Sequence, residues 1–143
     1  MSKEILITKR DGRREPLELD KLHKVVFHAC ENITGVSESE VEIKSHIQFF
    51  TGITSAEIQE TLIKSAADLI TEETPNYQFV AGRLINYHLR KQVYGTFTPP
   101  CLCDIIQDNI DRGFYDAEIL ELYTKEEIDE LSDYIVHERD ESL

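Results

Sequence analysis

The chain has 143 residues, of which 41% are hydrophobic and 30% are charged, and its formal net charge is −13. This length is enough for one domain with a core, or for a domain and an appendage. Every apolar stretch is shorter than the roughly 20 residues that a membrane-spanning helix needs. Residues 1–4 lack the apolar core of a signal peptide. We therefore expect a soluble, cytoplasmic protein.

The chain contains three cysteines, Cys30, Cys101 and Cys103. An odd number without a CxxC pair argues against a disulfide framework or a zinc ribbon, so we expect structural roles for these thiols. The histidines have no metal-type spacing to the cysteines or to one another. We predict no metal site made of protein side chains.

The negative charge is concentrated in the last third of the sequence. Residues 1–95 hold 12 Lys and Arg against 14 Asp and Glu, a charge of −2, whereas residues 96–143 hold 3 against 14, a charge of −11. An acidic end repels nucleic acid, so polymer binding is not expected. A small phosphate-bearing ligand on the nearly neutral front part remains compatible with this distribution.

The first elements expected are a hairpin and a helix. Strands at residues 5–8 and about 14–18 flank Asp11-Gly12, a sequence that favours a tight turn. A helix should follow, capped by Asp20 or the residue before it, with apolar residues at a period near 3.6. We expect this helix to stop between Asn32 and Gly35.

The rest of the chain predicts helices. We expect one from Ser37 to Gly52, one that follows a capping box of Thr54 and Glu57, and a long one from about Tyr77 to Val93. Beyond Thr98-Pro99-Pro100 the pattern indicates helices at 102–113 and 117–122, and another after Thr124. The predicted fold class is α+β and mostly helical, with an N-terminal β-hairpin capping a helical bundle. We expect two parts, residues 1–95 and an acidic helical connector at 96–143.

Basic side chains gather around the predicted hairpin and the start of the first helix. Lys9, Arg10 and Lys21 are close enough along the chain to converge, and Lys91 could join them through folding. A nucleoside triphosphate needs such cations, free backbone amides and usually Mg²⁺. The alternative is that these are solvated surface charges. The sequence contains neither a Walker loop nor a GxGxxG motif, so the two common phosphate cradles do not apply.

A series of motifs runs along the chain. It begins with Thr8-Lys9-Arg10-Asp11-Gly12 and Leu19-Asp20-Lys21-Leu22, and continues through residues 42–49, 63–70, 75–78 and 81–84. It extends through His88-Leu89-Arg90-Lys91-Gln92-Val93-Tyr94-Gly95 to residues 123–124 and 137–140. With these motifs, in this order, the chain resembles the ATP-cone of class I ribonucleotide reductase large subunits, and the resemblance covers nearly the whole chain.

The resemblance implies a regulatory site for ATP or dATP with Mg²⁺ held through the phosphates. It implies phosphate contacts from the four cations, adenine contacts from Glu15 and the Leu17–Glu18 backbone, and apolar walls around the base. Ser55 stands where the family usually has Thr, and Gln59 where related enzymes often have His. Glu57 replaces a commonly shorter Asp. The predicted nucleotide-binding residues are Ile7, Lys9, Arg10, Glu15, Leu17, Glu18, Lys21, Leu22, Phe49, Ser55, Ile58, Gln59, His88 and Lys91.

The resemblance further implies control of overall reductase activity through subunit assembly, with ATP activating and dATP inhibiting. The expected partners are the catalytic barrel of the large subunit and the small, radical-generating subunit. The sequence ends before that family's catalytic segments, so we predict no catalytic residues here and expect a regulatory piece. Two alternatives stay open: a free-standing ATP-cone protein that binds reductase subunits in trans, and a helical interaction domain that has lost nucleotide binding. A transcriptional repressor is discounted, because its type carries a four-cysteine zinc ribbon ahead of the cone.

Overall fold

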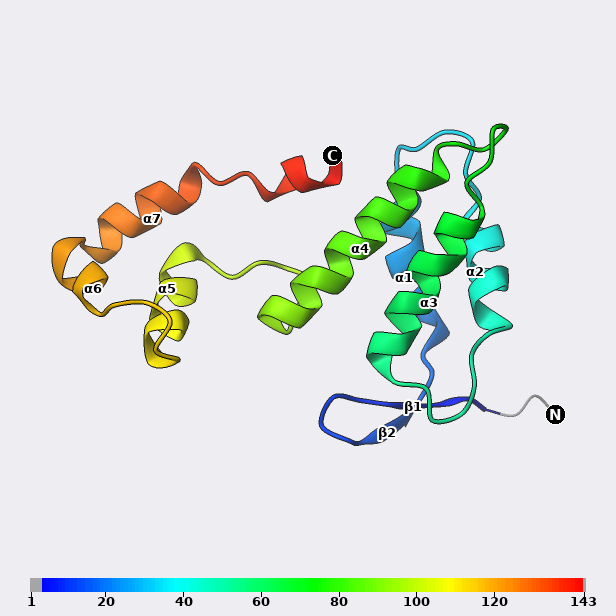
Figure 1. The fold of residues 1–143 in the computed structure, drawn as a ribbon, viewed down its shortest axis with the longest axis horizontal. Helices are drawn as coiled ribbons and strands as arrows, with labels where there is room; N and C mark the ends of the chain where they lie inside the picture. The colour runs from blue at the N-terminus through cyan, green and yellow to red at the C-terminus, as the bar shows by residue number, and fades with distance from the viewer. Residues whose placement is uncertain (1–3, 143) are drawn as a thin grey trace. The chain divides into compact units, whose positions relative to one another are not determined.

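The structure is a computed structural model that describes residues 4–142. It consists of a two-stranded antiparallel sheet and seven α-helices, followed by one 3-10 helix (Figure 1). The predicted α+β class with an N-terminal hairpin is confirmed. The chain divides into two compact units, one built on residues up to Leu89 together with residues from Glu141 onward, and one on Arg90–Asp140.

The hairpin forms where the Asp-Gly turn predicts it. Strand β1 (Leu6–Thr8) pairs antiparallel with β2 (Arg14–Pro16), and Ile7 lies opposite Glu15. The Asp11 carboxylate accepts a hydrogen bond from the Arg13 amide at 3.0 Å. Gly12 has a φ of 86°, which glycine adopts without the penalty that a Cβ would bring. The turn chemistry therefore sets the register of the hairpin.

The second edge of β1 pairs with the segment that precedes the third helix. The Thr8 amide donates to the Ile53 carbonyl at 2.8 Å, and the Gly52 amide donates to the Leu6 carbonyl at 2.8 Å. An isolated parallel bridge joins Thr8 to Thr54. Strand β1 is thus held on both sides.

Helix α1 (Leu19–Cys30) begins earlier than the predicted cap. Asp20 lies inside its first turn, and Glu18 is the N-cap residue, which makes no side-chain capping bond. The cap prediction was therefore wrong. Since the Leu17 amide donates to the Ile5 carbonyl at 2.8 Å, the chain stays tied to the hairpin until just before the helix starts.

Helix α2 (Glu38–His46) begins as predicted, because the Ser37 hydroxyl accepts a hydrogen bond from the Glu40 amide at 3.4 Å. It ends at His46, well before Gly52, so the predicted end was wrong. The backbone of residues 52 and 53 is bonded to β1 instead, and these long-range bonds stop the helix from continuing.

Helix α3 (Ser55–Asp68) carries the predicted capping box. The Thr54 hydroxyl accepts from the Glu57 amide at 3.1 Å, and the Glu57 carboxylate accepts from the Thr54 amide at 2.9 Å. The two bonds satisfy backbone donors that have no partner within the helix.

Replacing Thr54 with alanine should lower the free energy of unfolding by about 1 kcal/mol, because one of these capping bonds is lost. Urea denaturation measures this change. Thr61→Ala is the matched control on the same helix: its hydroxyl donates to the Glu57 carbonyl at 2.7 Å, and its removal should be nearly neutral. Equal losses for the two variants would contradict a special role for the cap.

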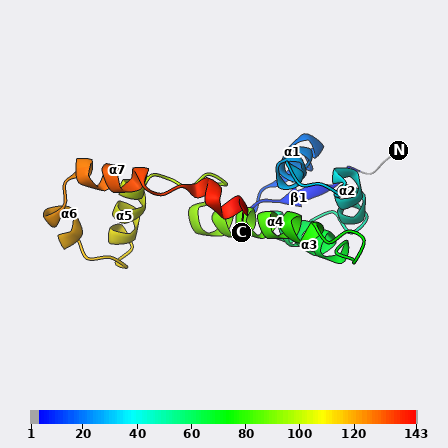
Figure 2. The same cartoon turned by 90° about the horizontal axis from the view of Figure 1, so that it is seen from above.

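Helix α4 (Tyr77–Tyr94) runs beside α3 in both views (Figures 1 and 2). The first half of α4 is hydrogen-bonded to the start of α2 and to the end of α1. The buried Tyr77 hydroxyl accepts from the Ser37 amide at 2.9 Å and donates to Glu40 at 2.6 Å. Arg83 donates to the Glu31 carbonyl at 2.6 Å, just past the end of α1. These bonds fix the start of α2 and the end of α1 against α4.

The core of the first unit lies between the hairpin and these four helices. Its fully buried members include Val26 from α1, Val41 from α2, Leu62 from α3 and Leu84 from α4, each 0% exposed. Cys30 is also buried, and burial raises the pKa of its thiol to about 11. A thiol with this pKa stays protonated at neutral pH and acts as a small apolar side chain.

The second unit contains α5 (Leu102–Asp111), α6 (Glu118–Leu122), α7 (Lys125–Asp133) and the 3-10 helix η1 (His137–Ser142), whose last residues belong to the first unit. Helices α5 and α7 pack together, and the Ser132 hydroxyl accepts from the Leu102 amide at 3.3 Å. Ile128 is buried, while many large apolar side chains of this unit are exposed. Within residues 4–142, no helix combines the length and apolar character needed to cross a bilayer.

Candidate functional site

The apolar residues predicted to surround a base come together in the first unit. Ile7, Leu22, Phe49 and Ile58 all belong to its buried core, and Leu17 packs against that core. They come from β1, α1, the segment after α2, and α3. The fold therefore gathers residues that are up to 51 positions apart in the sequence.

The predicted phosphate-binding cations of the hairpin region lie beside carboxylates. Lys9 Nζ is 3.7 Å from Glu15 across the hairpin, and Lys21 Nζ is 3.2 Å from Glu18 on the entry to α1. Arg10 is exposed and lies in the turn that follows β1. Partly or largely exposed ion pairs of this kind contribute little stability and exchange readily, so a multiply charged anion can compete for the two lysines.

The N-terminus of α3 lies next to this basic region, because the Thr8–Thr54 bridge joins it to β1. Ser55 is the first residue of the helix. The first amides of a helix have no intrahelical partners and carry partial positive charge, which favours an anion. Lys9 follows Thr8 directly, so a cation and a helix N-terminus share this end of the unit.

Polar atoms without a hydrogen-bond partner also occur among the predicted residues. In the part of the chain that the structure describes, Ser55 Oγ, Gln59 Oε1 and His88 Nδ1 are buried and unpaired, as is Asn86 Nδ2, which the sequence did not single out. Ser55 and Gln59 lie four residues apart on α3 and hence on one face. A buried polar atom without a partner is costly, so each of these atoms is available to a polar ligand or to a water molecule.

Lys91 lies in the last turn of α4, in the second unit. Its ammonium group lies 5.0 Å from the centre of the Phe97 ring, a cation–π contact within that unit. Its predicted phosphate contact remains a prediction.

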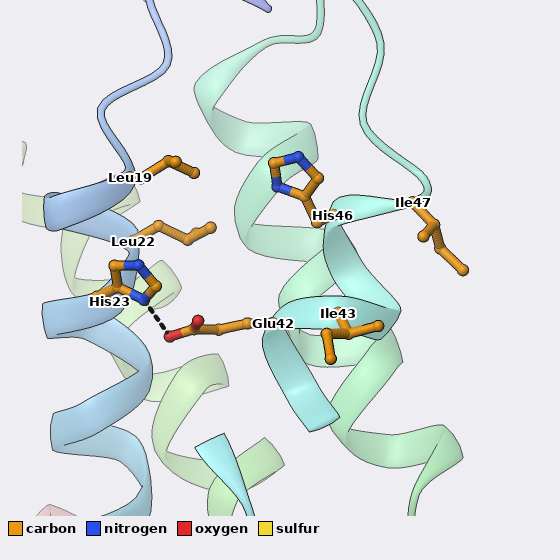
Figure 3. Close-up of a pocket in the computed structure, with 7 residues that line it drawn as sticks. All are labelled: Leu19, Leu22, His23, Glu42, Ile43, His46 and Ile47. Atoms are coloured by element: carbon orange, nitrogen blue, oxygen red, sulfur yellow. Dashed lines mark hydrogen bonds and ion pairs between the residues drawn. The ribbon is translucent and has the colours of Figure 1, made fainter. Parts of the chain in front are cut away.

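The sequence did not reveal an apolar groove between α1 and α2, which we call the α1–α2 groove (Figure 3). Its volume is about 300 Å³, and Leu22 is the one predicted site residue among its lining residues. In the sequence, the signal that could have indicated the groove is the four-residue spacing of Ile43 and Ile47. The structure shows that both side chains are exposed. The groove is lined by Leu19, Leu22, His23, Glu42, Ile43, His46 and Ile47.

An ion pair crosses this groove. His23 Nδ1 on α1 lies 2.6 Å from Glu42 Oε1 on α2, and the dashed line in Figure 3 marks the contact. The hydrogen bond from His23 to the Glu42 carboxylate raises the pKa of the imidazole, and the negative charges of Asp20 and Glu38 add to this effect. Within residues 4–142, no group of three or more His, Cys, Asp or Glu side chains is arranged to hold a metal ion.

The ATP-cone family model matches residues 5–92, which contain the hairpin and α1 to α3 with most of α4. The chain belongs to the ATP-cone domain family. It is 48% identical, over 98% of its length, to ribonucleoside-diphosphate reductase 1 subunit alpha of Salmonella typhimurium and to that of Escherichia coli. It is 47% identical, again over 98% of its length, to ribonucleoside-diphosphate reductase subunit alpha of Haemophilus influenzae. The chain spans 18% of the length of each of these relatives and corresponds to their N-terminal region.

Proposed function

We propose that this chain is an allosteric regulatory domain that binds ATP or dATP, with Mg²⁺ held through the phosphates, and controls a ribonucleotide reductase. Membership in the ATP-cone family supports the binding of a nucleotide effector in general. The unpaired Ser55, Gln59 and His88 atoms are the structural observation that carries the proposal, because the residues that the resemblance assigns to the nucleotide contain polar atoms without partners.

The proposed contacts follow from the chemistry of each side chain. Lys9 and Lys21 bind phosphate oxygens in exchange for Glu15 and Glu18. The Ser55 hydroxyl and those first amides of α3 that the capping box does not use donate to the same triphosphate. Arg10 supplies further positive charge, and a phosphate contact of Lys91 stays a prediction from the resemblance.

Gln59 is the residue proposed to contact the sugar. Its unpaired Oε1 atom accepts hydrogen bonds, so a ribose hydroxyl is a suitable partner for it. ATP and dATP differ by one such hydroxyl. If a buried protein group has this hydroxyl as its hydrogen-bond partner, losing the hydroxyl costs about 1–3 kcal/mol of binding free energy. This difference is enough for the site to distinguish ATP from dATP.

The regulatory output is proposed to be subunit assembly. The relatives are alpha subunits of reductases, and the chain corresponds to a limited part of them. The proposed partners are the catalytic barrel of the alpha subunit and the small, radical-generating subunit. In this scheme ATP keeps the reductase active and dATP inhibits it.

Isothermal titration calorimetry with the whole chain tests nucleotide binding. ATP and dATP, each with Mg²⁺, should bind, whereas adenosine should bind at least about 100-fold more weakly because it lacks the charged phosphate contacts. Gln59→Leu should bring the affinities for ATP and dATP closer together. No heat with either nucleotide at millimolar concentration would favour the alternative of an interaction domain that has lost nucleotide binding.

A further inference from the structure

The ion pair of His23 and Glu42 is placed to control the α1–α2 groove. Both residues line the groove, and they come from opposite helices, 19 positions apart in the sequence. The His23 side chain is 56% exposed, and that of Glu42 is 19% exposed. The imidazole can therefore exchange its proton with water, while the carboxylate is held more firmly against the protein.

We propose that this ion pair is a proton-controlled latch across the α1–α2 groove, and that a nucleotide bound at Lys21 favours the latched form. The second half of this inference rests on the proposed function. With His23 protonated, the pair is a charge-assisted bond that holds α1 to α2. With His23 neutral, the attraction between the charges is lost and the two helices are held less firmly.

The carboxylates around His23 favour the latched form. Asp20 faces it from its own helix, and Glu38 and Glu42 face it from α2. His46 is the other titratable side chain in the lining of the groove. Because the pKa of His23 is raised in the folded chain, the pair contributes fully to stability below the ordinary histidine pKa of about 6.5. This contribution is lost as the pH rises through the higher folded pKa.

Helix α1 connects the latch to the nucleotide site. Lys21, Leu22 and His23 are consecutive, so they lie within about 3 Å of one another along the helix axis. Leu22 belongs both to the core proposed to surround the base and to the lining of the groove. A triphosphate at Lys21 replaces the single charge of Glu18 with several negative charges, which stabilise protonated His23. By linkage, protonation of His23 must strengthen nucleotide binding by the same factor.

The histidine ring signals in the NMR spectrum of the whole chain test the latch directly. Glu42→Gln should lower the pKa of His23, and Mg²⁺-ATP should raise the pKa of His23 in the wild-type chain. In calorimetry, the wild-type chain should bind Mg²⁺-ATP about two- to fivefold more tightly than His23→Gln at pH 6, and equally at pH 8.5. Comparing the two chains at each pH cancels the titration of ATP itself.

A second ion pair on α1 gives a matched control. His28 Nδ1 lies 3.6 Å from Glu31 at the other end of the helix and does not line the groove. Glu31→Gln should therefore leave the response of His23 to ATP unchanged. If ATP binds and the His23 titration does not move, the coupling is wrong and the proposed function stands. If Glu42→Gln leaves the pKa of His23 unchanged, the latch itself is wrong. An absence of ATP binding would overturn both the coupling and the proposed function.

Discussion

Replacing Lys9 with alanine should remove half or more of the thermal stabilisation that ATP gives to this chain. A ligand that binds only the folded state stabilises it by about 2.7 kcal/mol at 100 times its dissociation constant, which raises the melting temperature of a domain of this size by roughly 10 °C. A lysine that bonds to a phosphate contributes about 1.5–3 kcal/mol. Its loss weakens binding by roughly 10- to 100-fold, so at the same ATP concentration the stabilisation falls from about 2.7 kcal/mol to about 0.4–1.4 kcal/mol.

Differential scanning fluorimetry with and without Mg²⁺-ATP measures this effect. The melting temperature without nucleotide should change little in Lys9→Ala, because the Lys9–Glu15 pair is partly exposed and stabilises the fold by less than about 1 kcal/mol. Lys64→Ala on the exposed part of α3 and Lys125→Ala on α7 remove the same charge elsewhere. Both should keep the full ATP shift. A full shift in Lys9→Ala as well would place the phosphates away from the hairpin.

Leu84→Ala should lower the free energy of unfolding by about 2–5 kcal/mol, because it leaves a cavity in a fully packed region. Leu84 is 0% exposed and packs in the same core as Val26 and Leu62. Since small domains are stable by only about 5–15 kcal/mol, this single change removes a large fraction of the total. Urea denaturation, followed by circular dichroism, measures the loss.

Leu89→Ala is the matched control on the same helix. Leu89 is 53% exposed, so its truncation should cost less than about 1 kcal/mol. The pair of variants compares the inner and outer faces of α4 with the same chemical change. Similar losses at the two positions would mean that α4 does not present Leu84 to the core.

Local signals in the sequence predicted the elements that local bonds determine. Asp11-Gly12 predicted the hairpin because the turn is closed by its own side chain and by the φ that glycine permits. Thr54 and Glu57 predicted the start of α3 because both capping bonds lie within four residues. These features depend on neighbouring residues only, so one sequence was sufficient to find them.

Long-range contacts account for what the sequence did not predict. Helix α2 ends at His46 because residues 52 and 53 bond to β1, more than 40 positions earlier. The α1–α2 groove and the His23–Glu42 pair depend on how two helices pack, which hydrophobic periodicity does not specify. The apolar residues of the candidate site were identified by resemblance, and the unpaired atoms of Ser55, Gln59 and His88 are visible only in three dimensions.

The position of β1 between β2 and the segment leading into α3 has a mechanical consequence. Thr8 is bonded to Ile53, and the capping box of α3 begins at the next residue, Thr54. The hairpin therefore cannot swing or fray without disturbing the first turn of α3. Local opening of the two elements should be one cooperative event, so hydrogen exchange at the Thr8 and Gly52 amides should report the same free energy of opening.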